Sequence, residues 1–173
     1  MKESKEEKFM QLYHPINDRF ERFCIARSFG IMDYKDLMHD TLIVAFEKIE
    51  RISNEKSFLY FLFGTAVRIL SNHRKKNRPN LSENSLKEFE NKVDSTNIDL
   101  DFEIVNLYNQ LAKLEQKTKE CIILFEISGF SIKEIMIIQN SGESAVKQRL
   151  SRGRKELLEL LKSSELINLK NEN

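Results

Sequence analysis

The residues best suited to chemistry with a partner lie between positions 144 and 155. On a helical wheel of about 100° per residue, most polar members of this stretch fall on one side, while Arg149 and Arg154 flank the apolar stripe. The residues on the polar side are Ser144, Lys147, Gln148, Ser151, Arg152 and Lys155, hereafter the basic face. Lysine, arginine and glutamine reach base edges in the major groove, whereas serine and lysine hold phosphates. The pattern therefore predicts DNA binding, and the alternative is a solvated face on an ordinary helical hairpin.

Two helices separated by a polar turn would position the basic face. An apolar stripe on the other side predicts packing against a preceding helix, and it comprises Val146, Leu150, Gly153 and Leu157. Upstream, Ser131 and Glu134 have the spacing of a capping box, which starts a helix. Asn140 and Gly142 tolerate the positive φ of a sharp turn, and Ser141 or Gly142 can cap the next helix. Together these features predict a helix-turn-helix.

Nearer the N-terminus, another helix is predicted from its N-cap Asp33 to about Ile49. This helix has two apolar faces. The first is predicted to be core and contains Met38, Leu42, Ala45, Phe46 and Ile49. The second contains Leu37, Thr41, Ile43 and Val44, edged by Asp36, Asp40 and Glu47. A helix in a small domain needs one buried stripe, so a second one framed by carboxylates predicts a protein partner with a basic rim. The alternative is a central helix buried on several sides.

The next helical segment, residues 57–78, combines aromatic and basic residues. Its aromatic residues are Phe58, Tyr60, Phe61 and Phe63, too many for one helical stripe. The downstream basic run and its polar neighbours are Arg68, Asn72, His73, Arg74, Lys75, Lys76 and Arg78. Bases of single-stranded nucleic acid stack on rings while phosphates meet cations, which makes this segment a candidate single-strand site. The alternative is an aromatic core with a basic helix end, which suits the helix dipole.

Composition favours an all-helical fold with local nucleic-acid contacts. Among 173 residues, 28 Lys and Arg oppose 27 Asp and Glu, for a formal net charge of +1, so the chain is not expected to coat DNA by charge alone. Five Gly and two Pro leave few turns, and strand-like alternation is nearly absent. We expect a cytoplasmic protein without membrane insertion, since no apolar run is long enough, no signal peptide is present, and Cys24 and Cys121 suit buried thiols.

Neither catalysis nor a cofactor is predicted. Asp36, His39 and Asp40 lie within one helical turn, but two carboxylates and one imidazole need further ligands, which are remote in the sequence. No glycine-rich phosphate loop, nucleophile elbow or supported acid–base pair is present. We therefore expect no metal and no enzymatic activity.

Two helical blocks are separated by a change in composition. Between Asn80 and Asp101 the chain is rich in Ser, Asn, Asp and Glu, and its apolar residues follow no sustained period, which is typical of a flexible acidic linker. We predict two small helical domains over residues 1–79 and 104–165, the second with the helix-turn-helix. Residues 80–103 would be the linker and residues 166–173 a polar tail.

Three segments, in this order, resemble the bacterial extracytoplasmic-function (ECF) sigma factors of RNA polymerase. Residues 33–46 are similar to the family's D-x-x-DLxQExF helix, and residues 58–76 are similar to its F-x-x-WLxxIAxNxxxDxxR helix. Residues 111–114 with residues 129–157 resemble its C-terminal helix-turn-helix. The resemblance implies a transcription initiation factor that binds core polymerase, recognises the minus-ten and minus-thirty-five promoter elements and assists melting.

The resemblance also implies roles for the surfaces above. The first domain would correspond to sigma region 2 and dock on the clamp helices of the β′ subunit through Asp36, Leu37, Asp40, Val44 and Glu47. The minus-ten element would be contacted by Tyr60, Arg68, Asn72, His73, Arg74, Lys75 and Lys76. The second domain would correspond to sigma region 4, read the minus-thirty-five element with the basic face and touch the β flap. An anti-sigma factor is a further partner that the resemblance implies.

The chain departs from the family pattern at several positions. Arg68 stands where the family usually has Asn, and Asn72 stands where Asp is common, so minus-ten preference does not follow from the family. Glu115 replaces the usual proline before the last domain, Met136 replaces a small alanine, and residues 139–140 replace a Leu-Gly turn. The turn geometry is therefore expected to differ a little.

Two other functions fit parts of the sequence. A helix-turn-helix transcriptional regulator with an N-terminal sensor domain would bind duplex DNA without being a polymerase subunit. A protein-interaction module would use its basic helix to bind acidic partners. Neither of these two functions accounts for the aromatic and basic residues of the segment 58–78.

Overall fold

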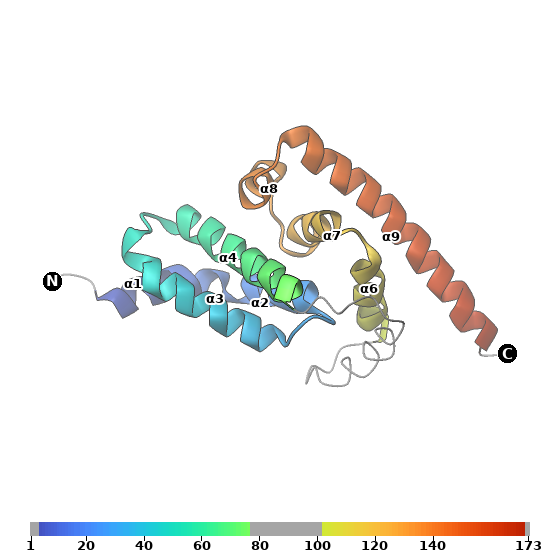
Figure 1. The fold of residues 1–173 in the computed structure, drawn as a ribbon, viewed down its shortest axis with the longest axis horizontal. Helices are drawn as coiled ribbons and strands as arrows, with labels where there is room; N and C mark the ends of the chain where they lie inside the picture. The colour runs from blue at the N-terminus through green and yellow to red at the C-terminus, as the bar shows by residue number, and fades with distance from the viewer. Residues whose placement is uncertain (1–3, 77–101, 172–173) are drawn as a thin grey trace. The chain divides into compact units, whose positions relative to one another are not determined.

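The computed structural model describes residues 4–76 and 102–171, with side chains up to Glu165 (Figure 1). These residues form helices, turns and bends without a strand, which confirms the predicted all-α fold. The chain divides into two compact units, Met1–Thr96 and Asn97–Asn173. Nearly all of the predicted linker, and Arg78, lie outside the described residues.

The N-terminal unit has α3 at its centre. Its described elements are α1 (Lys5–Tyr13), η1 (His14–Ile16), α2 (Asn17–Ser28), α3 (Tyr34–Lys48), η2 (Ile49–Arg51) and α4 (Glu55–Lys76). Asp33 caps α3 as predicted, because its carboxylate accepts a hydrogen bond from the Lys35 amide at 2.7 Å. Gly30 before it has a φ of 70°, which suits glycine at the end of a helix. α3 packs against both α2 and α4.

Aromatic rings from α2 and α4 meet in the core of this unit. The Phe63 centroid lies 4.9 Å from that of Phe23, and a tilted contact of this kind adds to the free energy of apolar burial. The aromatic residues of α4 are divided between core and surface. Phe58 and Phe63 are buried, whereas Tyr60 and Phe61 remain partly exposed.

The prediction of the α3 core was wrong in part. The buried residues of α3 are Leu37, Thr41 and Ala45. Three members of the predicted core stripe, Met38, Leu42 and Phe46, are only half-buried. Because α2 and α4 both contact α3, the buried line passes through Leu37 and Thr41, which the sequence pattern placed in the second apolar face, the one assigned to a partner. The Thr41 hydroxyl donates to the Leu37 carbonyl at 2.7 Å, which satisfies the polar group in the core.

The C-terminal unit ends in a long helix. Its described elements are α6 (Phe102–Lys113), α7 (Gln116–Ile122), the π-helical turn η3 (Ile123–Ile127), α8 (Ile132–Gln139) and α9 (Glu143–Asn171). α9 packs on α6, α7 and α8. It also continues through most of the tail predicted for residues 166–173 (Figure 1).

Helix caps define the turns of this unit. The predicted capping box is confirmed, since Ser131 Oγ accepts from the Glu134 amide at 3.3 Å and Glu134 Oε2 accepts from the Ser131 amide at 2.8 Å. Glu115 caps α7 by accepting from the Thr118 amide at 3.0 Å. Burial alone would raise the pKa of Glu115, but hydrogen bonds from Lys117 and Thr118 hold it below its usual value. A carboxylate cap thus occupies the position where the family has proline.

α9 approaches α7 closely at Gly153. The predicted stripe is buried at Val146, Leu150 and Gly153 and half-buried at Leu157. A Cβ on Gly153 would lie 2.7 Å from Thr118 Cγ2 and 2.9 Å from Ile122 Cγ1, well inside the ordinary separation of non-bonded carbons. Glycine therefore sets how near the two helices lie.

We expect Gly153→Ala to lower the free energy of unfolding of the C-terminal unit by about 1–3 kcal/mol, the usual cost of overpacking. Gly64→Ala is the matched control, because a Cβ at this helical glycine meets nothing within 4 Å. It should stabilise the N-terminal unit by roughly 0.5–1 kcal/mol through helix propensity. Hydrogen exchange of the α7, α9 and α4 amides measures both effects. Equal stabilisation by the two changes would contradict the close approach.

Candidate nucleic-acid and protein interfaces

All six residues of the basic face lie on α9, and all six side chains are exposed. Because the stripe through Val146 and Leu150 is buried against the rest of the unit, the orientation of α9 is defined by packing. The basic face therefore projects into solvent from a helix that the unit holds in place. Such an arrangement can enter a DNA major groove.

A polar network that sequence reasoning missed secures the turn between α8 and α9. Asn140 has a φ of 47°, which confirms that it accommodates the positive φ of the turn. Arg149 Nη1 donates to Gln139 Oε1 at 3.0 Å and to Ser141 Oγ at 2.9 Å. The side-chain Nε2 of Gln139 in turn donates to Glu120 Oε1 at 2.9 Å. These bonds tie α9 to α7 through Gln139, one of the two residues that replace the family's Leu-Gly pair.

The Gly142 carbonyl accepts from the Val146 amide at 3.1 Å, so Gly142 occupies the N-cap of α9. The Ser141 hydroxyl instead donates to the Gln139 carbonyl at 3.1 Å. Of the two predicted caps, the structure thus places glycine at the start of the helix. This choice leaves Ser141 available to Arg149.

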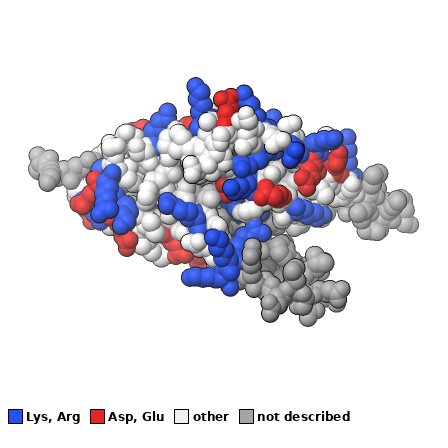
Figure 2. Space-filling view, turned by 45° about the horizontal axis from the view of Figure 1, so that its top comes forward, with Lys and Arg blue, Asp and Glu red and all other residues white. Residues whose placement is uncertain are grey.

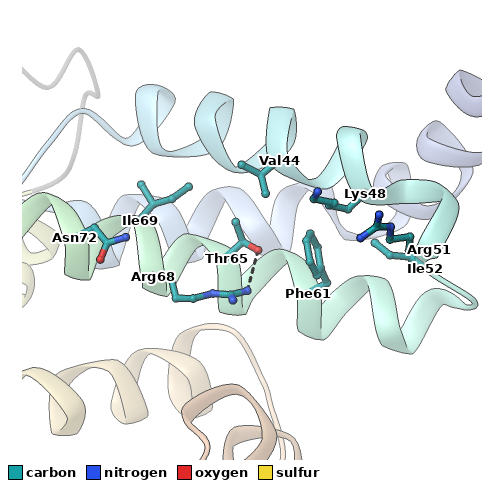
Figure 3. A pocket seen from close by; sticks show the side chains of 9 residues that line it. All are labelled: Val44, Lys48, Arg51, Ile52, Phe61, Thr65, Arg68, Ile69 and Asn72. Atoms are coloured by element: carbon teal, nitrogen blue, oxygen red, sulfur yellow. Dashed lines mark hydrogen bonds between the residues drawn. The ribbon is translucent and has the colours of Figure 1, made fainter.

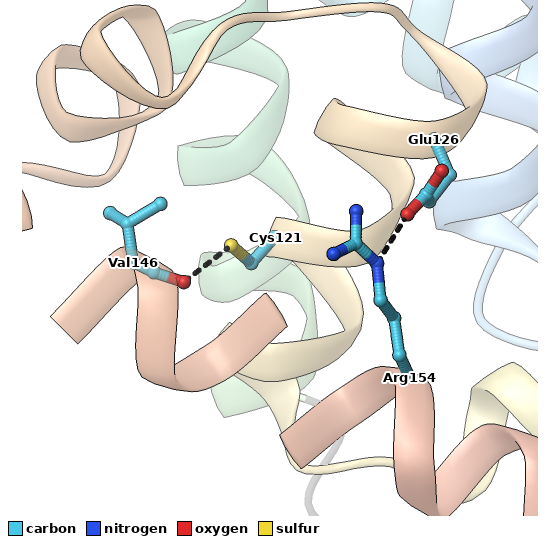
Figure 4. A network of polar contacts seen from close by, with 4 residues as sticks. All are labelled: Cys121, Glu126, Val146 and Arg154. Carbon is cyan, nitrogen blue, oxygen red and sulfur yellow. Dashed lines mark hydrogen bonds and ion pairs between the residues drawn. The ribbon is translucent and has the colours of Figure 1, made fainter. Parts of the chain in front are cut away.

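Two cations of α9 differ in their partners. Lys147, in the basic face, pairs with Glu143 one turn earlier at 2.6 Å. Both side chains are mostly exposed, so the pair is weak and a phosphate can replace it. Arg154 instead pairs with Glu126 of η3 at 2.7 Å (Figure 4), and its guanidinium lies 5.1 Å from the Phe125 centroid. Arg154 therefore connects α9 with η3 through a half-exposed ion pair and a contact with the Phe125 ring.

Figure 4 also shows the second contact at this place, from Cys121 on α7 to the Val146 carbonyl on α9. The sulfur lies 3.7 Å from the oxygen, and burial raises the pKa of the Cys121 thiol to about 11. Both cysteines are free and buried, as predicted. The thiol thus acts as a packing group behind the basic face.

The exposed side of α3 is acidic around an apolar centre. Asp36, Asp40 and Glu47 are exposed, Ile43 is 45% exposed and Val44 is half-exposed. The prediction for Leu37 was wrong, because this side chain has 0% exposure and belongs to the core. The acidic face of α3 is therefore defined by Asp36, Asp40, Ile43, Val44 and Glu47.

A groove of about 490 Å³ runs between α3 and α4 (Figure 3). The side chains that give it chemical character are Lys48, Arg51, Phe61, Arg68 and Asn72. Arg68 lies along its own helix, since Nε donates to the Gly64 carbonyl at 3.3 Å and Nη2 to the Thr65 hydroxyl at 3.5 Å. A ring beside cations and an amide can stack a base, hold its phosphate and hydrogen-bond its edge.

The groove gathers only part of the predicted single-strand site. Arg68 and Asn72 line it, whereas Tyr60 does not. His73 is half-buried, and Arg74, Lys75 and Lys76 form an exposed basic end of α4. Lys48 and Arg51 were missed because they come from the end of α3 and from η2, and no periodicity within α4 points to them.

Charge is distributed in local patches. Figure 2 shows Lys and Arg side chains over the visible face with Asp and Glu between them, in keeping with a net charge of +1. Among the described residues, no group of three or more His, Cys, Asp and Glu could hold a metal ion. In the same part of the chain, no helix is both long and apolar enough to cross a membrane.

Comparison with known proteins points to one family. Residues 104–157 match the family described as Sigma-70, region 4. A curated relative, "RNA polymerase sigma factor NccH" of Alcaligenes xylosoxydans xylosoxydans, is 25% identical over 150 residues, which cover 82% of this chain and 81% of the relative.

Two solved structures share the fold. One is CnrH in complex with the cytosolic domain of CnrY, with a TM-score of 0.63, 23% identity and coverage of 90% of this chain and 88% of the other. The second is the sigma factor RpoE of Bartonella quintana in complex with the anti-sigma factor NepR, with a TM-score of 0.66, 24% identity and coverage of 89% and 96%. The region 4 match, the relative along most of the chain and the shared fold agree with the three sequence segments: the chain carries a Sigma-70 region 4 and is similar to RNA polymerase sigma factors along most of its length.

Proposed function

We propose that this sigma factor divides promoter-directed initiation among three surfaces. The acidic face of α3 docks on polymerase, the groove between α3 and α4 takes the melted minus-ten strand, and the basic face of α9 reads the minus-thirty-five element. The first two surfaces belong to a region 2-like domain (residues 1–79) and the third to a region 4-like domain (residues 104–165). The observation that carries the proposal is the exposure of all six residues of the basic face on one side of a helix with a packed opposite side.

The reading of duplex DNA follows from the position of each residue along α9. Ser144, Lys147 and Gln148 lie in its first two turns, and the N-terminal part of a recognition helix contacts base edges. Ser151, Arg152 and Lys155 lie further along and are suited to phosphates. The bonds from Arg149 and the close packing at Gly153 support this role, because they fix the axis from which the side chains reach the groove.

Docking on polymerase follows from the acidic face of α3. Its carboxylates surround Ile43, and Val44 lies between this face and the groove that it also lines. This is the arrangement of a protein interface with an apolar centre and a charged rim. The proposed partner is the pair of clamp helices of the β′ subunit, whose contacting surface should be basic. The β flap is the proposed contact of the region 4-like domain.

Binding of the melted strand follows from the groove. A single-stranded base needs a stacking surface, and its backbone needs cations; Phe61 supplies the first, while Lys48, Arg51 and Arg68 supply the second. Arg74, Lys75 and Lys76 would extend the path along the basic end of α4. This sigma factor would thus assist melting by holding one strand, and we propose that it carries out no catalysis itself.

An anti-sigma factor is a further proposed partner, because the solved relatives CnrH and RpoE are bound to CnrY and NepR respectively. Since polymerase is the working partner, we place the protein in the cytoplasm. Purification from cells would identify both kinds of partner.

Purified protein and core polymerase together should give run-off transcripts from a promoter of the source organism that core alone ignores. The reason is that the promoter contacts on α4 and α9 direct initiation only when the acidic face of α3 and the region 4-like domain hold the protein on core polymerase. Transcripts are measured on a library of genomic promoter fragments. Tight duplex binding by the free protein with no transcript from any fragment would instead support the regulator that acts without being a polymerase subunit.

Asp40→Lys and Ile43→Ala should each weaken binding to core polymerase about tenfold or more, since a misplaced charge or a lost apolar centre disrupts an interface. Asp18→Lys is the charge-matched control, because Asp18 is exposed on α2. Leu37→Ala should instead reduce folding stability by about 2–5 kcal/mol, as for other buried leucines. Affinity and thermal melting are measured side by side, and unchanged affinity for Asp40→Lys would remove the docking role.

Lys155→Ala should lower the slope of log affinity against log salt by about one unit for holoenzyme binding to minus-thirty-five duplex, the value expected for one lost phosphate contact. Arg154→Gln is the matched control, because this neighbouring cation is held by Glu126. Its slope should stay close to that of the unchanged protein. If both variants lowered the slope of log affinity against log salt by the same amount, the basic face would have no directed phosphate contact.

A further inference from the structure

Lys8 of α1 makes two long-range bonds to the connection between α3 and α4. Its Nζ donates to the Ile49 carbonyl at 3.1 Å and to the Ile52 carbonyl at 2.8 Å. The partners are separated from it by more than 40 residues in sequence. An ammonium has three donors in a compact group, so one side chain can hold the carbonyls at the two ends of η2. The Ile49 carbonyl also accepts from the Ile52 amide at 3.1 Å, so the bonds from Lys8 add to a connection that is already closed by its backbone.

α1 is well placed to hold Lys8 in position. Its first turn is closed by a capping box between Ser4 and Glu7. Phe9 packs edge-on against Phe46 of α3 at 5.4 Å and Phe58 of α4 at 5.8 Å between centroids. α1 therefore contacts the end of α3 and the beginning of α4 at once, and Lys8 lies next to this anchor.

The same connection forms one end of the groove. Arg51 and Ile52 line it together with Phe61 (Figure 3). Ile52 thus has two roles, because its carbonyl accepts a hydrogen bond from Lys8 while its side chain forms part of the groove wall. A shift of this carbonyl would move both Ile52 and the adjacent Arg51 guanidinium.

We propose that Lys8 is a positioning residue for the promoter strand. It holds the connection of residues 49–54 in the conformation that places Arg51 and Ile52 at the groove, and it touches no nucleotide itself. The inference rests on the proposed binding of the minus-ten strand in this groove. It adds α1, which no sequence motif marked, to the parts of the protein that determine promoter discrimination.

The test measures holoenzyme binding to two labelled single strands, one carrying the minus-ten sequence identified by run-off transcription and one with that sequence scrambled. Lys8→Met removes the donors and keeps the length of the chain. It should weaken binding of the minus-ten strand about tenfold, a scale set by lost hydrogen bonds from a charged donor, and leave the scrambled strand within about twofold on the same scale. Discrimination between the strands therefore falls.

Lys8→Arg keeps a cation with several donors and should restore most of the discrimination. Lys5→Met is the control, since it removes an equal charge from α1. The Lys5 ammonium lies over the Phe46 ring, 4.6 Å from its centroid. This variant should bind both strands as the unchanged protein does. Affinity for core polymerase should be the same in all four proteins.

Three results would overturn the inference: unchanged discrimination in Lys8→Met, an equal loss for both strands, or the same loss in Lys5→Met. An equal loss would reveal a general effect on folding. Absence of discrimination in the unchanged holoenzyme would instead overturn the proposed groove function, and the role of Lys8 with it. The two failures are thus distinguished by the behaviour of the unchanged protein.

Discussion

The close approach of α9 to α7 at Gly153 is the constraint on which the DNA-binding half of this protein depends. A recognition helix needs one face free of intramolecular contacts and the opposite face packed tightly enough to fix its axis. Gly153 permits that packing because Thr118 and Ile122 fill the space where a side chain would be. The polar bonds of Arg149 and the ion pair of Arg154 then secure α9 at two further places. As a result the six residues of the basic face project from a fixed surface.

In the N-terminal unit a single helix, α3, contributes both to the core and to an exposed surface. α3 buries the line through Leu37, Thr41 and Ala45 and leaves an acidic face around Ile43 for a partner. Its end and η2 also supply Lys48 and Arg51 to the groove. The surfaces proposed for polymerase docking and for strand binding therefore share one helix, α3. Lys8 extends that element to α1.

The helix-turn-helix was the most predictable part of the chain. Its capping box, its positive-φ residue and its buried stripe are local patterns, and each was found where the sequence placed it. The α3 helix was predicted in extent but not in orientation, since Met38, Leu42 and Phe46 are more hydrophobic than the Thr41 that is actually buried.

The sequence by itself determined the helices, their caps and the residue types on their surfaces, because these depend on spacing within one turn or a few turns of the chain. Only the tertiary structure decided which stripe of α3 is core, which partners Arg149 and Arg154 bind, and which cations meet in the groove. Those outcomes depend on contacts between residues far apart in sequence, such as Lys8 with Ile52 and Arg154 with Glu126. The basic face could be predicted from helical periodicity alone, whereas the groove could not, because its lining residues come from α3, η2 and α4.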